Sequence, residues 1–548
     1  MIRSAHLDTF TRDNLPSESE WPDFRFELPE LAYPERLNCA TAFVDRWVAA
    51  GRGDRPCLIA PTETLSYAAL AERVNRIANV LTRDLGMVPG NRVLLRSANN
   101  PMMVAAYFAV IKAGGVVVAT MPLLRAKELG YALDKARIGL ALCDRRLDDE
   151  MEKARAAAPG LDRIVYWGDS GTESLERLMA QPDYERFEAC DTAIDDVCLI
   201  GFTSGTTGEP KGTMHFHRDM LAICDTYGRY VLRADADDRF IGSPPLAFTF
   251  GLGGLVLFPL HVGASTVLLE RASPDDLLPA IAKYRATVCF TAPTAYRAML
   301  GKLAGVDISS LRKSVSAGET LPKATFEAWR DATGIAMQDG LGSTEMLHIF
   351  VCAREEEMRA GLTGKAVPGY EVRVIDDAGD EVPPGTAGRL AVRGPTGCRY
   401  LADARQRQYV QRGWNVTGDT YVMDRDGYFR YQARSDDMII SAGYNIAGPE
   451  VEAALMTHPA VAECGVVGAP DEERGQIVKA YVVLRPGQAG DGAQAQALQD
   501  HVKRSIAPFK YPRAIEFVES LPRTESGKLK RFELRRMALV SAERRAAS

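Results

Sequence analysis

The sequence predicts an α/β protein: a large N-terminal domain of parallel-sheet subdomains with a β-rich subdomain, and a small, mobile C-terminal α+β domain. From about residue 60 onward, amphipathic helical patterns alternate with short apolar runs, as in strand–helix–strand units with buried parallel sheets. Between residues 364 and 434, short strand patterns are separated by turn sequences such as DDAGDE and PPGTAG. The length of 548 residues also exceeds what one hydrophobic core usually supports.

The clearest strand–helix–strand unit lies near the N-terminus. Ser66 is expected to cap a helix that ends near Gly86, because apolar residues recur on one of its faces, namely Leu70, Val74, Ile77 and Leu81. Residues 92–96 then form a predicted strand, residues 101–112 a second helix and residues 116–119 a second strand. A helical crossover of this length favours parallel pairing of the two strands.

Beyond Arg434 the pattern changes again. VEAALMTHPAV at 451–461 predicts a helix, AYVVLRP at 480–486 a strand and LQDHVKRSI at 498–506 another helix. These elements make a unit of ordinary domain size. We therefore predict an N-terminal domain at 1–434 and a C-terminal domain at 435–548, with a hinge near Asp436.

Composition and charge exclude several classes of protein. The net charge of −6 argues against a general nucleic-acid binder, although residues 503–548 are rich in Lys and Arg and suit anionic small molecules. The first residues lack the apolar core of a signal peptide, and the ten cysteines and seven histidines show no metal-ligand spacing, which favours a cytoplasmic protein with reduced thiols. The apolar stretches 102–124 and 247–269 are interrupted by Lys, Gly and Pro and read as buried core, so no membrane association is expected.

The strongest local signal is TSGTTGEPKG at 203–212, directly after the apolar run 197–202. Glycines let backbone N–H groups approach phosphate oxygens, hydroxyl groups add donors, and Lys211 adds a positive charge. The spacing differs from the common P-loop, because Pro210 and Gly212 stand where that pattern requires Gly and Ser or Thr. The composition still predicts a phosphate-binding loop, the alternative being a flexible turn rich in Gly and Thr.

This loop resembles the phosphate loop of the adenylate-forming superfamily, which includes acyl-CoA synthetases, adenylation domains and beetle luciferases. Further stretches match that family in its order along the chain: SAGE at 316–319, GSTE at 342–345, TGD at 417–419, RSDD at 434–437 and PRTESGK at 522–528. The resemblance covers nearly the whole chain. It implies ATP, Mg²⁺ and coenzyme A as cofactor and co-substrates.

The resemblance also implies a role for each matched position. Glu345 would hold Mg²⁺, which favours oxygen ligands, and Thr344 would donate to the α-phosphate. The remaining nucleotide and CoA positions are Thr203, Ser204, Gly205, Thr206, Thr207 and Lys211 for phosphate, Gly318, Glu319 and Asp339 for adenine, Asp419 and Arg434 for ribose and phosphate, and Ser441 and Gly443 for the pantetheine channel. Leu341 stands where the family more often has an aromatic residue.

The residue expected to dominate catalysis is Lys528. Its ammonium would lie between the carboxylate and the α-phosphate while negative charge moves between them, an electrostatic role rather than proton transfer. In the family the C-terminal domain then turns about the position of Asp436, withdraws this lysine and presents the segment 441–443 to coenzyme A. A surface lysine in a basic tail is the alternative reading of Lys528.

The acid is expected to be small and aromatic. GSTEMLHIF at 342–350 resembles aryl-CoA ligases of the benzoate and 2-aminobenzoate type, and aromatic residues in LAFTFGLG at 246–253 suit a flat ring. The predicted substrate-binding residues are Phe248, Thr249, Phe250, Gly342, His348 and Ile349. The Thr249 hydroxyl group would pair with an ortho substituent, which favours 2-aminobenzoate.

Several alternatives remain open at this point. The acid could instead be a medium-chain acid, and the acyl group could be loaded onto a carrier protein instead of coenzyme A. A luciferase-like oxygenase would share the adenylation motifs, whereas a regulator without turnover would not need Glu345, Asp419 and Lys528. A hydrolase is disfavoured because neither GxSxG nor HExxH occurs. A monomer and a homodimer fit the sequence equally.

Overall fold

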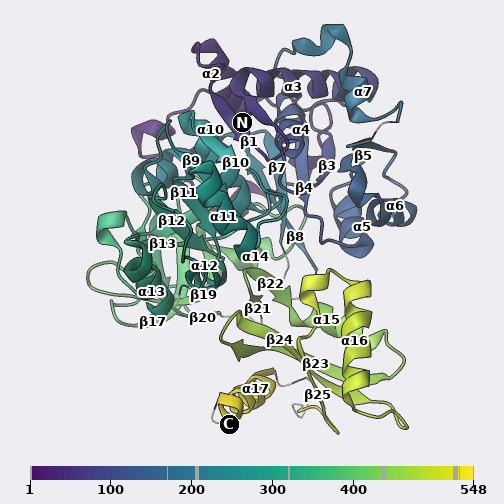
Figure 1. Cartoon of the computed structure of the whole chain (residues 1–548), viewed down its shortest axis with the longest axis vertical. Coiled ribbons are helices and arrows are strands. Elements are labelled where there is room, and N and C mark those ends of the chain that lie inside the picture. The colour runs from purple at the N-terminus through teal and green to yellow at the C-terminus, as the bar shows by residue number, and fades with distance from the viewer. Residues whose placement is uncertain are drawn as a thin grey trace.

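The computed structural model describes residues 3–169, 171–203, 209–318, 321, 323–434, 438–522, 529 and 531–546. These residues form four β-sheets with helices packed around them, and Figure 1 shows the C-terminal elements as a separate unit at one end of the molecule. The expected combination of parallel sheets, a β-rich subdomain and a C-terminal domain is confirmed.

The first sheet contains the predicted strand–helix–strand unit. Its strand order is β6 (Arg163–Trp167), β5 (Leu140–Asp144), β3 (Arg92–Arg96), β4 (Val116–Thr120), β7 (Val197–Thr203) and β8 (Lys211–Phe216). All neighbours pair parallel except β7 and β8, which pair antiparallel. The helices that accompany this sheet are α3 (Tyr67–Asn79), α4 (Pro101–Lys112), α5 (Ala126–Lys135), α6 (Asp148–Ala157) and α7 (Leu175–Met179).

The predicted boundaries in this region are close to the observed ones. The Ser66 hydroxyl group accepts a hydrogen bond from the backbone N–H of Ala69 and so caps α3, as expected. The helix α4 has the predicted bounds: Asn100 caps its start and Pro101 occupies its first turn, and it ends at Lys112 shortly before Gly114, which has a positive φ. Both apolar stretches become packed elements. Within the described residues, no helix is long and apolar enough to cross a membrane.

The second sheet is nine-stranded and mostly parallel in its centre. Its order is β15 (Lys365–Ala366), β14 (Ile349–Cys352), β13 (Met337–Gly342), β12 (Lys313–Ala317), β11 (Val288–Thr291), β9 (Arg239–Gly242), β10 (Ser265–Val267), β1 (Pro56–Ile59) and β2 (Thr64–Ser66). The α-helices along this part of the chain are α8 (His217–Ile223), α9 (Thr249–Leu252), α10 (Phe258–Val262), α11 (Pro274–Tyr284), α12 (Pro293–Leu300) and α13 (Lys323–Thr333). Three short helices lie elsewhere in the large domain: α1 (Phe10–Asp13), α2 (Arg46–Ala49) and α14 (Gln406–Tyr409).

The third sheet is the β-rich subdomain. It contains β16 (Glu371–Ile375), β17 (Ala387–Arg393), β19 (Trp414–Met423), β18 (Val410–Gln411) and β20 (Phe429–Arg434), and all its pairs are antiparallel. This pairing explains the short strand patterns and frequent turns of residues 364–434, since antiparallel neighbours need only tight connections.

The C-terminal domain has its own sheet and core. Its strands are β22 (Tyr444–Ala447), β21 (Met438–Ser441), β24 (Gly475–Leu484), β23 (Val461–Asp471) and β25 (Ala514–Phe517). Its helices are α15 (Gly448–Met456), α16 (Gly492–Ser505) and α17 (Arg531–Ala546). Buried aliphatic residues such as Val451, Val482 and Leu498 join α15 and α16 to the sheet, whereas α17 packs through Leu534 and Ala538 in a second cluster. The helix predicted at 451–461 is wrong at its end. It stops at Met456 because His458-Pro459 leads into β23, and proline cannot continue a helix.

Candidate active site

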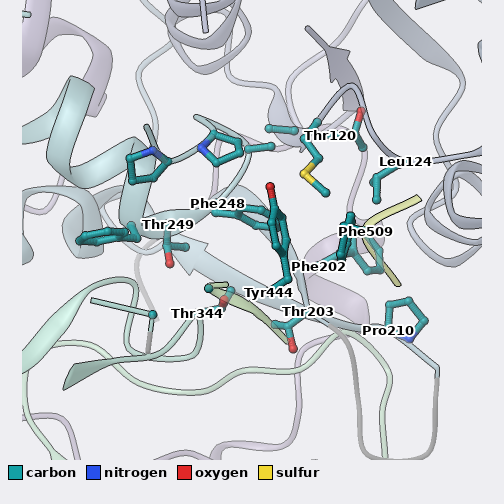
Figure 2. Close-up of a pocket in the computed structure, with 18 of the residues that line it drawn as sticks. Thr120, Leu124, Phe202, Thr203, Pro210, Phe248, Thr249, Thr344, Tyr444 and Phe509 are labelled. Carbon is teal, nitrogen blue, oxygen red and sulfur yellow. The ribbon is translucent and has the colours of Figure 1, made fainter. Parts of the chain in front are cut away.

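A cavity of about 330 Å³ lies between the large domain and the C-terminal domain. Figure 2 shows part of its lining, contributed by segments that are far apart in the sequence. Its walls include the ends of β4, β7, β12 and β13, the segment before α9, and C-terminal residues of β22 and the loop after α16. Because strand ends from two sheets meet here, this is where an α/β fold is expected to bind ligands.

One end of the cavity carries the predicted acid-binding residues. Phe248, Thr249 and Phe250 line it from the start of α9, and Gly342, His348 and Ile349 line it from the end of β13 onward. The segments 248–250 and 342–349, about 100 residues apart in the sequence, therefore line the same end of the cavity. Asn99 positions the segment before α9, since its side-chain amide donates to Pro244 O (2.9 Å) and accepts from Leu246 N (2.9 Å).

His348 is almost completely buried at this end, with 3% of its surface exposed. Its ring lies edge-on to Phe258 at 4.6 Å and contacts the rings of Phe250 and Tyr227. Burial lowers the pKa of His348 to about 3, although its Nε2 lies 3.4 Å from the Phe250 carbonyl oxygen. The imidazole is therefore neutral at physiological pH and contributes shape, not charge.

A glycine makes room for this histidine. A Cβ atom on Gly253 would lie 2.3 Å from Cδ2 of His348, closer than real Cβ contacts. The ring therefore takes its place only because residue 253 has no side chain.

The phosphate end is built on the antiparallel pair β7 and β8. Thr203 ends β7 and pairs directly with Lys211, which begins β8, so the predicted phosphate loop connects two paired strands. Ser204, Gly205, Thr206 and Thr207 lie outside the described residues. Lys211 Nζ lies 3.7 Å from Glu345 Oε1 and over the rings of Tyr400 and Tyr409. The end of the phosphate loop and the predicted magnesium-binding carboxylate thus meet.

Glu345 is buried but remains an anion. Burial raises the pKa of this carboxyl group, but the Lys211 ammonium and a hydrogen bond from the Tyr400 hydroxyl group (2.6 Å to Oε1) together lower the pKa below its usual value. A buried, ionised carboxylate beside a phosphate loop suits Mg²⁺, which in nucleotide sites takes one or two protein carboxylates together with substrate phosphates. Thr344, the preceding residue, lines the cavity.

The predicted adenine and ribose positions lie on neighbouring strands. Gly318 follows β12 with a positive φ of 85°, and Asp339 lies on β13, paired with Ser316 of β12. Burial raises the pKa of Asp339 to about 7, with a hydrogen bond from Thr363 acting against it. Asp419 pairs with Arg434 across β19 and β20. Glu319 lies outside the described residues, as do Asp436 and Lys528.

The C-terminal domain contributes the loop between β21 and β22. Ala442 and Gly443 both have positive φ, and Gly443 lines the cavity within 3.8 Å of an ideal Cβ built on Gly318. Tyr444 follows and stacks on Phe509 with ring centroids 4.2 Å apart (Figure 2). Ser441 is buried behind this loop and is not among the residues that line the cavity.

Several residues of the site carried no recognisable signal in the sequence. Asn99, Tyr400, Tyr444 and Phe509 contact the matched residues or line the cavity, yet none belongs to a matched motif. Only the tertiary arrangement identifies them.

Comparison with known proteins agrees with this geometry. Residues 45–400 match the model of the AMP-binding enzyme family, and residues 450–528 match the AMP-binding enzyme C-terminal domain. The chain is 37% identical over 516 residues to a benzoate–CoA ligase of Thauera aromatica, covering 92% of this chain and 97% of that protein.

Solved structures agree as well. An anthranilate CoA ligase, AuaEII, in complex with anthranoyl-AMP is 35% identical, with a TM-score of 0.73 over 94% of this chain and 100% of that one. The amide bond synthetase McbA of Marinactinospora thermotolerans is 28% identical, with a TM-score of 0.83 over 91% of this chain and 99% of that one.

The chain therefore belongs to the AMP-binding enzyme family, the adenylate-forming class that its motifs predicted. Within that class it is an acid–thiol ligase, an AMP-forming acyl- or aryl-CoA ligase that uses ATP, Mg²⁺ and coenzyme A. The predicted aryl-CoA ligase branch is confirmed by these relatives.

Proposed function

We propose that this ligase activates a small aromatic acid, 2-aminobenzoate or benzoate, as an acyl adenylate and then transfers the acyl group to coenzyme A. One observation carries the proposal. The two segments with aryl-ligase character, 248–250 and 342–349, line a single cavity that also reaches Thr203 and Thr344 of the phosphate end. An acid bound among the aromatic rings would thus point its carboxylate toward the nucleotide.

The shape of the acid end supports an aromatic acid rather than a long-chain acid as the substrate. His348 lines this end, and Phe258 and Phe290, which are almost fully buried, pack against its ring and against each other, so closely packed rings back this part of the wall. The Thr249 hydroxyl group lies on this wall between the apolar side chains of Phe248 and Phe250, and Ser243 and His348 are further polar residues of the lining. The Thr249 hydroxyl group suits an ortho amino or hydroxyl substituent, because a buried hydroxyl group discriminates against ligands that leave it unpaired.

In the proposed first step, the chain's own residues provide charge and position. Lys211 and the phosphate loop would bind the triphosphate, Thr344 would donate to the α-phosphate, and Glu345 would hold Mg²⁺. The bound metal would neutralise phosphate charge as pyrophosphate leaves. Lys528 would lie between the acid and the α-phosphate. Asp339 would border adenine, and Asp419 would accept hydrogen bonds from the ribose hydroxyl groups.

In the proposed second step, the C-terminal domain, residues 435–548, turns about Asp436. The described arrangement brings Gly443 and Tyr444 to the cavity, which supports its assignment to the thioester-forming state. Lys528→Ala should then abolish adenylation and spare thioester formation from preformed adenylate. Asp436→Pro should hold one arrangement and block one half-reaction only. An equal loss of both half-reactions in Lys528→Ala would contradict the assignment of this lysine.

The direct test is pyrophosphate release with benzoate, 2-aminobenzoate, hydroxybenzoates and medium-chain acids, each with and without coenzyme A. We expect the aromatic acids to give the highest kcat/KM, and an aroyl-CoA product only when coenzyme A is present. A preference for medium-chain acids would refute the aromatic assignment. An adenylate that forms but never reacts with coenzyme A would refute the thioester step and favour an amine or carrier-protein acceptor.

The ortho-substituent hypothesis has a separate test. Thr249→Val keeps the side-chain volume and removes the hydroxyl group, so the ratio of kcat/KM for 2-aminobenzoate over benzoate should fall by about tenfold. Thr266→Val, which removes a fully buried hydroxyl group on β10 outside the residues that line the cavity, is the matched control and should leave the ratio as in the wild type. An unchanged ratio in Thr249→Val would remove the case for 2-aminobenzoate.

A further inference from the structure

A small cluster of buried charges lies where the C-terminal domain meets helix α5. Lys510 of the C-terminal domain is 6% exposed, and its Nζ lies 2.6 Å from Glu450 Oε1 and 3.4 Å from Glu128 Oε1. Glu450 belongs to the same domain as Lys510, whereas Glu128 belongs to the large domain and is 8% exposed. One ammonium group therefore contacts a carboxylate from each side of the domain boundary.

The carboxylate of Glu128 divides its two oxygens between the two domains. Oε2 accepts from the backbone N–H of Arg125 (3.1 Å) and caps its own helix. Oε1 accepts from the backbone N–H of Ala507 (2.9 Å) as well as contacting Lys510. Hydrogen bonds to a charged acceptor are about twice as strong as neutral ones. Glu128 is 8% exposed and Ala507 is fully buried, although Glu128 and Lys510 also belong to the lining of the cavity.

The cluster fixes the part of the C-terminal domain that completes the cavity. Ala507 and Lys510 flank Phe509, and Phe509 stacks on Tyr444, which follows Gly443. Phe509 and Tyr444 line the cavity (Figure 2). Gly443 lines it as well. Holding residues 507–510 against α5 therefore sets where the aromatic pair and the glycine stand relative to the acid.

Another contact between the domains is of a different kind. Arg297 donates to the backbone carbonyl of Glu472, and this pair is exposed to solvent. Exposed polar contacts of long side chains contribute little free energy. Of these two contacts, the buried one made by the Glu128 carboxylate is better suited to stabilise one orientation of the C-terminal domain. A turn of the C-terminal domain would separate Glu128 from both of its partners while Glu450 stayed with Lys510.

We propose that Glu128 is a positioning residue for the second half-reaction: its carboxylate receives Ala507 N–H and the Lys510 ammonium and thereby stabilises the domain arrangement in which coenzyme A attacks the adenylate. The inference rests on the proposed thioester step. Nothing in it requires Glu128 to touch the acid or the nucleotide.

The test uses Glu128→Gln in the full-length enzyme. The amide oxygen can still cap α5, but the amide NH₂ group then faces two donors. We expect single-turnover thioester formation from preformed aroyl-AMP to slow by about 10- to 100-fold, the effect of losing a buried charged hydrogen bond. Pyrophosphate release without coenzyme A should change by less than about twofold, because the first step uses another arrangement.

Glu150→Gln is the matched control. Glu150, a residue of α6, also supports the start of α5, because its Oε2 accepts from the backbone N–H of Ala126 (2.8 Å). Its described contacts, to Arg125, Ala126 and Lys153, all lie within the large domain. Glu150→Gln should leave the rates of both half-reactions unchanged.

A second variant tests the partner of Glu128. Lys510→Met should reproduce the selective slowing of thioester formation. The double variant with Glu128→Gln should be slowed by less than the product of the two single effects, because the pair acts as one contact.

Equal slowing of both half-reactions in Glu128→Gln would show a general structural role and overturn the proposal, as would unchanged thioester formation. Wild-type enzyme with preformed aroyl-AMP and coenzyme A separates the two proposals. If the wild type itself forms no thioester, the proposed function fails first, whereas a wild type that forms thioester beside an unaffected Glu128→Gln refutes only the role of Glu128.

Discussion

Two parts of the cavity wall are held in place by different forces: the acid end, and the part contributed by the C-terminal domain, called here the interdomain end. At the acid end, His348, Phe258 and Phe290 are buried in the main hydrophobic core, and even a methyl group on Gly253 has no space. At the interdomain end, the half-buried Tyr444 and Phe509 depend on a few charged contacts across the boundary. Close packing gives a fixed shape, whereas a few polar contacts can form and break at small cost. This difference suits a ligase that must choose one acid and then change its active site between two steps.

The largest expected effect is at the phosphate end of the site. Glu345→Gln removes the negative charge that faces Lys211 and accepts from Tyr400. We expect adenylation, measured as pyrophosphate release, to fall by about 100- to 1,000-fold, because a preorganised charge in a buried site is lost. Tyr400→Phe keeps the carboxylate and removes one hydrogen bond, so its loss should be about tenfold. A Glu345→Gln enzyme with normal adenylation would contradict the metal-binding role.

A change in packing tests the acid end. Gly253→Ala places a Cβ against the His348 ring, so either the ring shifts toward the cavity or the helical segment Gly253–Leu257 is displaced. The kcat/KM for the acid should fall by about 100-fold with little change in the apparent KM for ATP, since a misplaced wall mispositions the carboxylate. Gly301→Ala, where an added Cβ meets nothing within 4 Å, is the control and should behave like the wild type. A comparable loss in both variants would mean that the effect is not local.

Truncation of an aromatic ring tests the interdomain end. Tyr444→Ala removes the stacking partner of Phe509 from the cavity wall. We expect thioester formation to slow by about tenfold, the effect of an aromatic pair and its buried area, with adenylation little altered. Stopped-flow measurement of the two half-reactions would show this split. If Tyr444→Ala slowed adenylation more than thioester formation, the interdomain end would not serve mainly the second step, and the contrast with the acid end would be wrong.

The smallest effect concerns stability and pH. The pKa of Asp339 is raised by burial from 3.8 to about 7, so the folded protein holds this proton more tightly than the unfolded chain does. Its contribution to stability is therefore favourable at low pH and is lost as pH rises from about 4 to 7. Asp339→Asn should raise Tm by a few degrees at pH 8 and by almost nothing at pH 4. Scanning calorimetry of Asp339→Asn and of the exposed control Asp331→Asn would measure these changes in Tm. A larger rise in Tm at low pH than at pH 8 would contradict the raised pKa of Asp339.

The strand–helix–strand unit and the order of motifs could be predicted from the sequence because they are local. Apolar periodicity and the caps at Ser66 and Asn100 determine where α3 and α4 begin, whatever surrounds them. The chemistry of the motifs is also local, since glycine, threonine and lysine within ten residues suffice to suggest phosphate binding. The predicted helix at 451–461 ended too late because periodicity alone does not show where a strand takes over.

The meeting of distant residues was decided only by the tertiary structure. Lys211 reaches Glu345, Glu128 reaches Lys510, and the fully buried side chains of Cys39, Cys198 and His217 come within 4.8 Å of one another, although no spacing in the sequence suggests a metal-ligand set. The sequence by itself determined the class of chemistry and the helices and strands that carry it. The site required packing of two sheets and a second domain, because contacts across hundreds of residues depend on how whole layers fit together rather than on any local pattern.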